Sequence, residues 1–205
     1  MKKGLKYLQI GQDKNYVALD ADYGVKLEGE TKVWDDVIVG LGDAVFKGVS
    51  DPVWTSFRGG QVLAFAKNQD NTIYFSAQIP HKYAVGEDIE FHLHCIYPDA
   101  NAGDVKWNLT YSWASMGVKF DTETSVSKYI AASTKADTHT YIDIVDISGT
   151  DYQGNKQGIS SILICCLQRE GTDGGDDYNN DVYLINSVDF HIPINTLGSR
   201  EEGSK

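Results

Sequence analysis

Two histidines stand one residue apart in an apolar stretch of this 205-residue chain, in the run His92-Leu93-His94. Successive side chains of a β-strand point to opposite faces, so a spacing of two places both imidazoles on the same face. Such a pair is suited to binding a shared metal ion. A third histidine, His191, lies near the C-terminus. These three residues are the metal-ligand candidates of the sequence.

The surroundings of the pair resemble the metal-binding motifs of the cupin family. Gly86 precedes the pair, Asp99 follows it, and His191 with Asn195 is similar to the end of the second cupin motif. The resemblance implies a metal-dependent enzyme with its ligands inside a jelly roll. The sequence departs from the motif, because the acid is Asp in place of Glu and no Pro-x-Gly precedes the later histidine.

The alternation of side chains around the pair argues against a cupin site. The odd positions from Ile89 to Cys95 are all apolar and claim the core face of the strand. The two histidines therefore point the other way, together with Glu90. We expect them on an outer face or in a subunit contact, with no metal and no cofactor bound. A metal site between subunits is the alternative.

The other reactive residues form no recognisable catalytic set. The acidic loop at 173–181 is rich in calcium-type oxygen ligands but lacks EF-hand spacing, so we expect a solvated hairpin loop. Cys95, Cys165 and Cys166 lie inside apolar runs, where burial dulls a thiol. Neither a Gly-x-Ser-x-Gly elbow nor a P-loop occurs. The sequence predicts that the protein is not an enzyme.

Four aromatic residues fall outside the apolar stripes of the sequence. They are Trp34, Trp54, Tyr74 and Tyr129. An exposed aromatic row could serve as a platform for sugar rings. Ordinary packing or a subunit interface is the expected role.

The elements that must position these residues are β-strands, because apolar and polar residues alternate with a period of two. In one such segment, Asn186 interrupts the alternation. The four segments with this pattern are residues 73–79, 89–95, 105–113 and 182–192.

Residues 159–167 break the alternation, since they are apolar on both faces from Ile162 onward. That composition is typical of a strand covered on both sides by a second sheet or a neighbouring subunit. We interpret it as a central strand of a sandwich.

Turn-forming residues separate about eight expected strands between residues 61 and 192. The sequence thus predicts a single all-β protein, an antiparallel, jelly-roll-like β-sandwich with an extended N-terminal arm. We place the arm, or a short β segment, at residues 1–30, the sandwich at 31–198 and a mobile polar tail at 199–205.

The net charge of −11 bears on possible partners. Phosphate backbones and anionic lipid surfaces repel an acidic protein, so we expect no nucleic-acid and no membrane partner. No stretch of about 18 apolar residues occurs, and the first fifteen residues lack the apolar core of a secretory signal. We expect synthesis in a cytoplasm.

Several phrases of the sequence, taken in order, resemble a family of uncharacterised virion proteins of tailed phages and prophages. The chain departs from that family at Gly203, where an aromatic residue is expected. The phrases lie at 16–20, 31–36, 75–83, 86–89, 92–94, 107–114, 160–165, 189–191 and 197–202.

This resemblance implies a structural protein of a phage particle that acts by assembly, with no catalytic residues to carry over. Its place would be a capsid decoration, a collar, a fibre or a tail attachment. The expected partners are further copies of the chain, with a trimer favoured, and other virion proteins. The alternatives are a carbohydrate-binding module for a glycan of the host surface and a cupin-like metalloenzyme.

Overall fold

The computed structural model describes residues 9–20 and 24–203, which form strands and two three-residue 3-10 turns. Neither turn is long enough to cross a membrane, and no helix of the described chain is. The 3-10 turns are η1 (Gly29–Thr31) and η2 (Leu41–Asp43). The strands are β1 (Gln9–Gln12), β2 (Asn15–Asp20), β3 (Gly24–Glu28), β4 (Val33–Gly40), β5 (Val53–Phe57), β6 (Gly60–Phe65), β7 (Asp70–Gln78), β8 (Ile89–Ile96), β9 (Asp104–Ala114), β10 (Thr124–Ala131), β11 (His139–Ile147), β12 (Ile162–Glu170) and β13 (Val182–Ile194).

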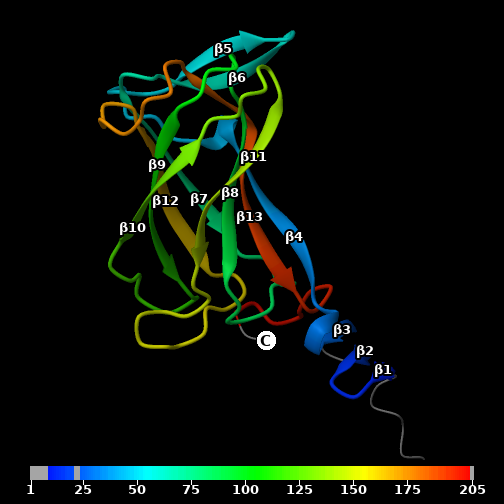
Figure 1. The fold of residues 1–205 in the computed structure, drawn as a ribbon. Coiled ribbons are helices and arrows are strands. Elements are labelled where there is room, and N and C mark those ends of the chain that lie inside the picture. Colours follow the sequence, from blue (N-terminus) through cyan, green and yellow to red (C-terminus); the bar gives the residue numbers. More distant parts are fainter. Residues whose placement is uncertain (1–8, 21–23, 204–205) are drawn as a thin grey trace, which may run out of the picture.

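Two antiparallel sheets pack face to face and form the body of the molecule (Figure 1). One has the strand order β10-β9-β12-β7, and the other has the order β11-β8-β13-β6-β5, with β4 also paired to β13. If β6 to β13 are numbered one to eight, the sheets read 5-4-7-2 and 6-3-8-1. This interleaving of two Greek keys is a jelly roll, so the predicted fold class is confirmed.

The core lies between the two sheets and is filled by the predicted apolar stripes. Trp107 of β9 is fully buried and lies edge-on to Phe65 of β6, with ring centroids 5.2 Å apart. Phe91 of β8 packs against Phe190 of β13 at 5.0 Å. Aromatic and aliphatic side chains thus fill the space between the two sheets.

The interruption predicted at Asn186 is a β-bulge. The pairing of β13 with β8 shifts register between Leu184 and Val188, and Asn186 adopts a φ of 61°. Asparagine tolerates this left-handed conformation better than most side chains, which explains why it stands there.

Strand β12 is central to its sheet, as predicted, but the chain covers only one of its faces. Leu163, Cys165 and Leu167 face the core, whereas Ile164 is 52% exposed on the outer face. The second sheet thus covers one face, and cover of the other face by a neighbouring subunit, the alternative from the sequence, stays a prediction. Ile164 and Cys166, both on the outer face of β12, line a surface hollow.

The predicted N-terminal arm is a small three-stranded sheet, β1-β2-β3, that projects from one end of the sandwich (Figure 1). Backbone pairing holds it to the residues that follow β13: Leu27 N–H donates to Asn195 O, and Leu197 N–H donates to Val25 O. Parts of the expected arm and tail, residues 1–8, 21–23 and 204–205, lie outside the described residues.

A buried ion pair lies at the opposite end of the sandwich. It joins the C-terminal end of strand β12 to the acidic loop between β12 and β13. The side chains of Arg169 and Asp176 are both fully buried. Arg169 Nε and Nη2 donate to the two carboxylate oxygens at 3.0 and 2.7 Å, and the guanidinium also donates to three backbone carbonyls. The expected solvated hairpin loop is thus a loop folded around an arginine.

We predict that Arg169→Met destabilises the protein by about 3–5 kcal/mol, because the substitution leaves the Asp176 carboxylate buried without a counter-charge. Urea unfolding followed by tryptophan fluorescence measures this. The matched control is Arg58→Met, since Arg58 pairs with Asp137 at the surface and an exposed pair contributes about 0–1 kcal/mol. Equal effects of the two substitutions would contradict the structural role of Arg169.

Candidate functional site

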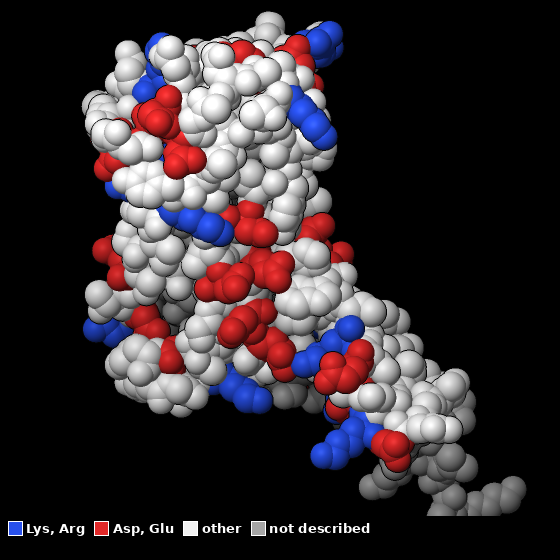
Figure 2. All heavy atoms as spheres, viewed as in Figure 1, with Lys and Arg blue, Asp and Glu red and all other residues white. Residues whose placement is uncertain are grey.

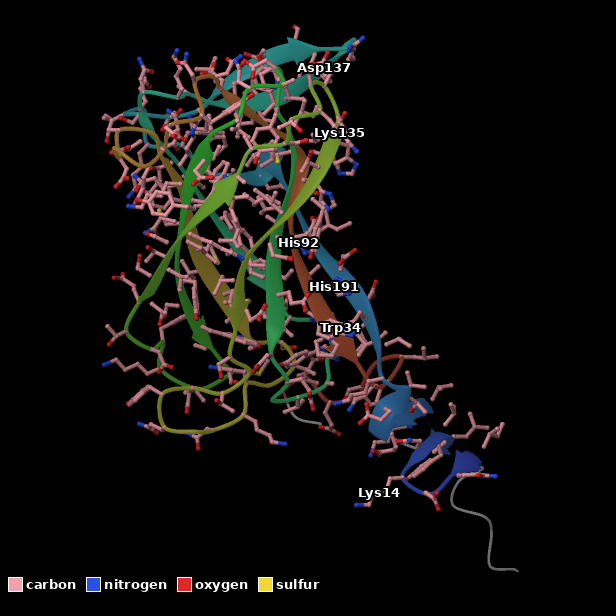
Figure 3. The ribbon with its side chains drawn as sticks, viewed as in Figure 1. Lys14, Trp34, His92, Lys135, Asp137 and His191 are labelled. Atoms are coloured by element: carbon pink, nitrogen blue, oxygen red, sulfur yellow. The ribbon has the colours of Figure 1, made fainter. Side chains whose placement is uncertain are left out.

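The predicted histidines lie on the outer face of the sheet that contains β8 and β13 (Figure 3). His92 and His94 alternate with the core-facing Phe91 and Leu93, which confirms the phasing expected from the sequence. The cupin arrangement is therefore wrong for this chain, because cupin ligands point into the barrel.

Strand register brings acidic residues beside the pair. His92 stands between Asp143 of β11 and Asp189 of β13 in one row across the sheet. In the next row, Glu90 of β8 is the direct cross-strand partner of His191 of β13. The outer face of this sheet is thus a grid in which imidazoles and carboxylates are direct cross-strand neighbours.

His92, His94 and Asp189 form the tightest group on this face, which we call the histidine cluster. The Nε2 atom of His94 lies 2.9 Å from Asp189 Oδ2, and the Nε2 atom of His92 lies 3.7 Å from the same oxygen. One potential ligand atom from each residue lies within 4.8 Å of the other two. His92 and Asp189 are buried, at 2% and 4% exposure, and His94 is half-buried.

Two atoms of the histidine cluster are buried without a hydrogen-bond partner among the described residues: His92 Nδ1 and Asp189 Oδ1. Burial lowers the pKa of His92 from its ordinary value, and the neighbouring carboxylate of Asp189 opposes that shift. The His92 ring and the Asp189 carboxyl group therefore each keep one buried atom without a partner among the described residues.

Two further histidines border the cluster. His139 Nε2 lies 2.7 Å from His94 Nδ1, so the two rings share one proton in a hydrogen bond. His191, the third predicted candidate, is less close, with its ring 6.0 Å from that of His92 and its Nδ1 3.7 Å from Asp36 Oδ1. The structure thus replaces His191 by Asp189 as the third member of the cluster.

Acidic side chains gather around the cluster and give this face a negative field. Figure 2 shows them along the middle of the face. They come from three strands, with Asp36 on β4, Glu90 on β8, and Asp143 and Asp146 on β11. Such a surface attracts cations and repels anions.

The four predicted aromatic residues do not form one row. Trp34 (50% exposed) and Trp54 (44%) belong to the sheet that contains β8, on the strands β4 and β5. Tyr74 and Tyr129 belong to the other sheet. Trp34 packs edge-on against His191, and the hydroxyl of Tyr129 donates to a carboxylate of the acidic loop. The four residues therefore do not form the single exposed row that the sugar-platform alternative requires, and the expected role in packing or a subunit interface stays a prediction.

A different aromatic hollow opens at one end of the sandwich, between the β9–β10 and β11–β12 loops. Its volume is about 590 Å³. Its lining includes Tyr111, Trp113 and Tyr152 together with the carboxylates of Asp121 and Glu123. None of the four predicted aromatic residues lines it. Sequence analysis missed this hollow because two loops that lie far apart in the chain build it.

Two of the three cysteines are buried as expected from their apolar context, whereas Cys166 is half-buried and lines a surface hollow. Cys95 and Cys165 are buried and all three thiols are free. Burial raises the pKa of the Cys95 thiol to about 12 and raises that of Cys165 as well. At neutral pH both are protonated and poor nucleophiles.

Comparisons with known proteins show little similarity. No model of a protein family matches the chain, and no curated protein matches it. Among solved structures, the crystal structure of "a non-crystalline cellulose specific carbohydrate-binding module: CBM28" is similar over 73% of this chain and 93% of that one. The sequence identity is 11% and the TM-score is 0.33.

Proposed function

We propose that this protein is a structural component of a tailed-phage or prophage particle that assembles with further copies of itself through its N-terminal three-stranded sheet. The observation that carries the proposal is that the described side chains of this sheet, β1-β2-β3, form no hydrophobic core of their own. The phage assignment itself rests on the sequence resemblance.

Apolar side chains of the N-terminal sheet are left in solvent. Ala18 is the one buried side chain among those described in β1, β2 and β3. Ile10 is 67% exposed and Leu19 is 52% exposed. A three-stranded sheet needs a hydrophobic face packed against something to be stable. A neighbouring molecule that covers these side chains would supply that packing.

The strand edges of the same region favour chain-to-chain pairing. Within the described chain, β1 pairs with β2 alone, so its other edge keeps unpaired backbone groups. Edge strands of this kind readily add a strand from another chain. A projecting element that packs on an identical neighbour is also a frequent route to symmetric oligomers.

The charge of the chain fits a subunit that must stay separate until it assembles. A net charge of −11 disfavours non-specific association between copies. It equally disfavours contact with packaged nucleic acid. We therefore place the protein on the outside of the particle, as a decoration, collar, fibre or tail-attachment protein, with a trimer as the expected state.

We predict that the full chain is an oligomer, and that the double substitution Ile10→Asp, Leu19→Asp converts it to a monomer. Charges placed on the exposed apolar side chains oppose their burial in an interface. Size-exclusion chromatography with light scattering measures the mass against the chain mass of 22.7 kDa.

The control for this experiment is Val49→Asp. Val49 is 78% exposed, but it lies in the loop before β5 and away from the N-terminal sheet. Its substitution should leave the oligomer intact. A wild-type chain that is monomeric at every concentration would sink the assembly proposal.

Carbohydrate binding is a second candidate function, favoured by the hollow lined by Tyr111, Trp113 and Tyr152. Aromatic faces stack on sugar rings, and the nearby carboxylates of Asp121 and Glu123 can accept hydrogen bonds from hydroxyl groups. Tyr152 is 78% exposed, so its ring is available to a ligand. A host-surface glycan is the partner that this site would take.

For this second candidate we predict at least one hit on a glycan array and a loss of affinity of about tenfold or more in Tyr152→Ala, since a stacked ring contributes about 1.4 kcal/mol. Trp54→Ala is the control, because Trp54 is exposed on β5 and does not line the hollow. An array without hits, or equal losses in both variants, would exclude the hollow as a sugar site.

A further inference from the structure

We propose that the histidine cluster is a binding site for one divalent transition-metal ion of the zinc class. His92, His94 and Asp189 are its ligands, and the site lies on the outer face of the sandwich. The inference is independent of the proposed assembly role.

The donor atoms lie at distances that one ion can bridge. Zinc binds histidine nitrogen and carboxylate oxygen at about 2.0–2.2 Å, so two ligands of a tetrahedral ion stand about 3.4 Å apart. The separations of 2.9 Å (His94 Nε2 to Asp189 Oδ2) and 3.7 Å (His92 Nε2 to Asp189 Oδ2) bracket that value. All three donors lie within 4.8 Å of one another, so the side chains would have to rotate to bring each pair to that separation.

Two buried polar atoms of the cluster bear on how an ion would be held. His92 Nδ1 and Asp189 Oδ1 are buried and accept or donate no hydrogen bond within the described chain. Native structures leave few buried polar atoms without a partner, and each such atom needs an explanation. An ion that the Asp189 carboxylate binds through both oxygens would give Asp189 Oδ1 a partner. The same ion would not engage His92 Nδ1, because it is bound at the other ring nitrogen, Nε2.

The residues around the cluster are arranged as they are around many metal sites. A histidine that ligates a metal through one ring nitrogen usually makes a hydrogen bond with the other, which fixes the orientation of the ring. His94 does this, since its Nδ1 lies 2.7 Å from His139 Nε2. His139 is thus the expected positioning residue of the site.

The backbone fixes the cluster firmly. His92 and His94 lie two residues apart on β8, and Asp189 is the direct cross-strand partner of His92 on β13. Strand β8 is itself paired on both sides, with β11 and β13. Ligands on a central strand and its neighbour keep their relative positions, which favours a preformed site over one assembled from loops.

The ligand types favour zinc-class ions over calcium or magnesium. Calcium and magnesium take oxygen ligands almost exclusively, whereas imidazole nitrogen suits zinc, copper, nickel and iron. Two of the three ligands here are imidazoles. A four-coordinate ion with three protein ligands has one further position for water or for a group of another molecule. The side chain of His94 is 27% exposed, so solvent can reach that position.

The test is a titration of the full chain, purified without a histidine tag and stripped with a chelator, with Zn²⁺ in a calorimeter and with Co²⁺ by visible absorption. We expect one ion per chain, undisplaced by excess Ca²⁺ or Mg²⁺. His92→Ala and Asp189→Ala should each lower the affinity by at least about 100-fold, and His139→Ala by about tenfold.

His81→Ala is the matched control, because His81 lies away from the cluster and contacts Ser160 and Ser199. Its substitution should leave Zn²⁺ affinity unchanged. Three results overturn the inference: no saturable Zn²⁺ binding by the wild type, equal losses in His81→Ala and His92→Ala, or displacement of Zn²⁺ by equimolar Ca²⁺.

A variant at a buried ligand can fail to fold, so a second measurement uses His94→Gln at the half-buried position. Zn²⁺ should raise the melting temperature of the wild type, because an ion that binds the folded state alone stabilises it. The same addition should leave the melting temperature of His94→Gln unchanged. An equal rise in both proteins would overturn the assignment.

Discussion

The closure of two sheets over an interior packed with aromatic rings is the constraint on which the rest of this molecule depends. Trp107, Phe65, Phe91 and Phe190 meet between the sheets, because the alternation of each strand turns its apolar side chains to that side. The buried Arg169, opposite Trp107, is a polar exception at one end. In the described chain, the space between the sheets is therefore filled by apolar side chains. Every polar group with a functional prospect is therefore displaced to an outer face, a loop end or the projecting N-terminal sheet.

Different outer surfaces carry the different candidate binding groups. The sheet with β8 and β13 carries imidazoles and carboxylates on its outer face, which suits a cation (Figure 2). The loops at one end of the sandwich bring Tyr111 and Tyr152 to a common hollow. The Asp176 carboxylate, by contrast, is held in a buried ion pair with Arg169 and so is not available for a ligand. The negative charge of a carboxylate does not show whether it is free to bind a ligand. The residue with which the carboxylate is paired shows this.

Local patterns predicted what depends on near neighbours in the chain. The two-residue period gave the strands, their core faces and the outward direction of His92 and His94, and Asn186 marked the bulge. What the sequence left open depends on pairing between distant strands. Asp189 joins the cluster because β13 pairs with β8 in one particular register, and a slip of one residue would turn its side chain into the core. No local pattern encodes that register.

Strand β13 links the two regions to which we assign roles. It pairs with β8 on one side and with β4 and β6 on the other, and it carries Asp189. Immediately after it, the backbone around Thr196 pairs with β3 and holds the N-terminal sheet. A strand paired along both edges opens only when the sheet itself unfolds. The same hydrogen-bonded ladder therefore fixes the position of a ligand in the histidine cluster and the direction in which the N-terminal sheet leaves the sandwich.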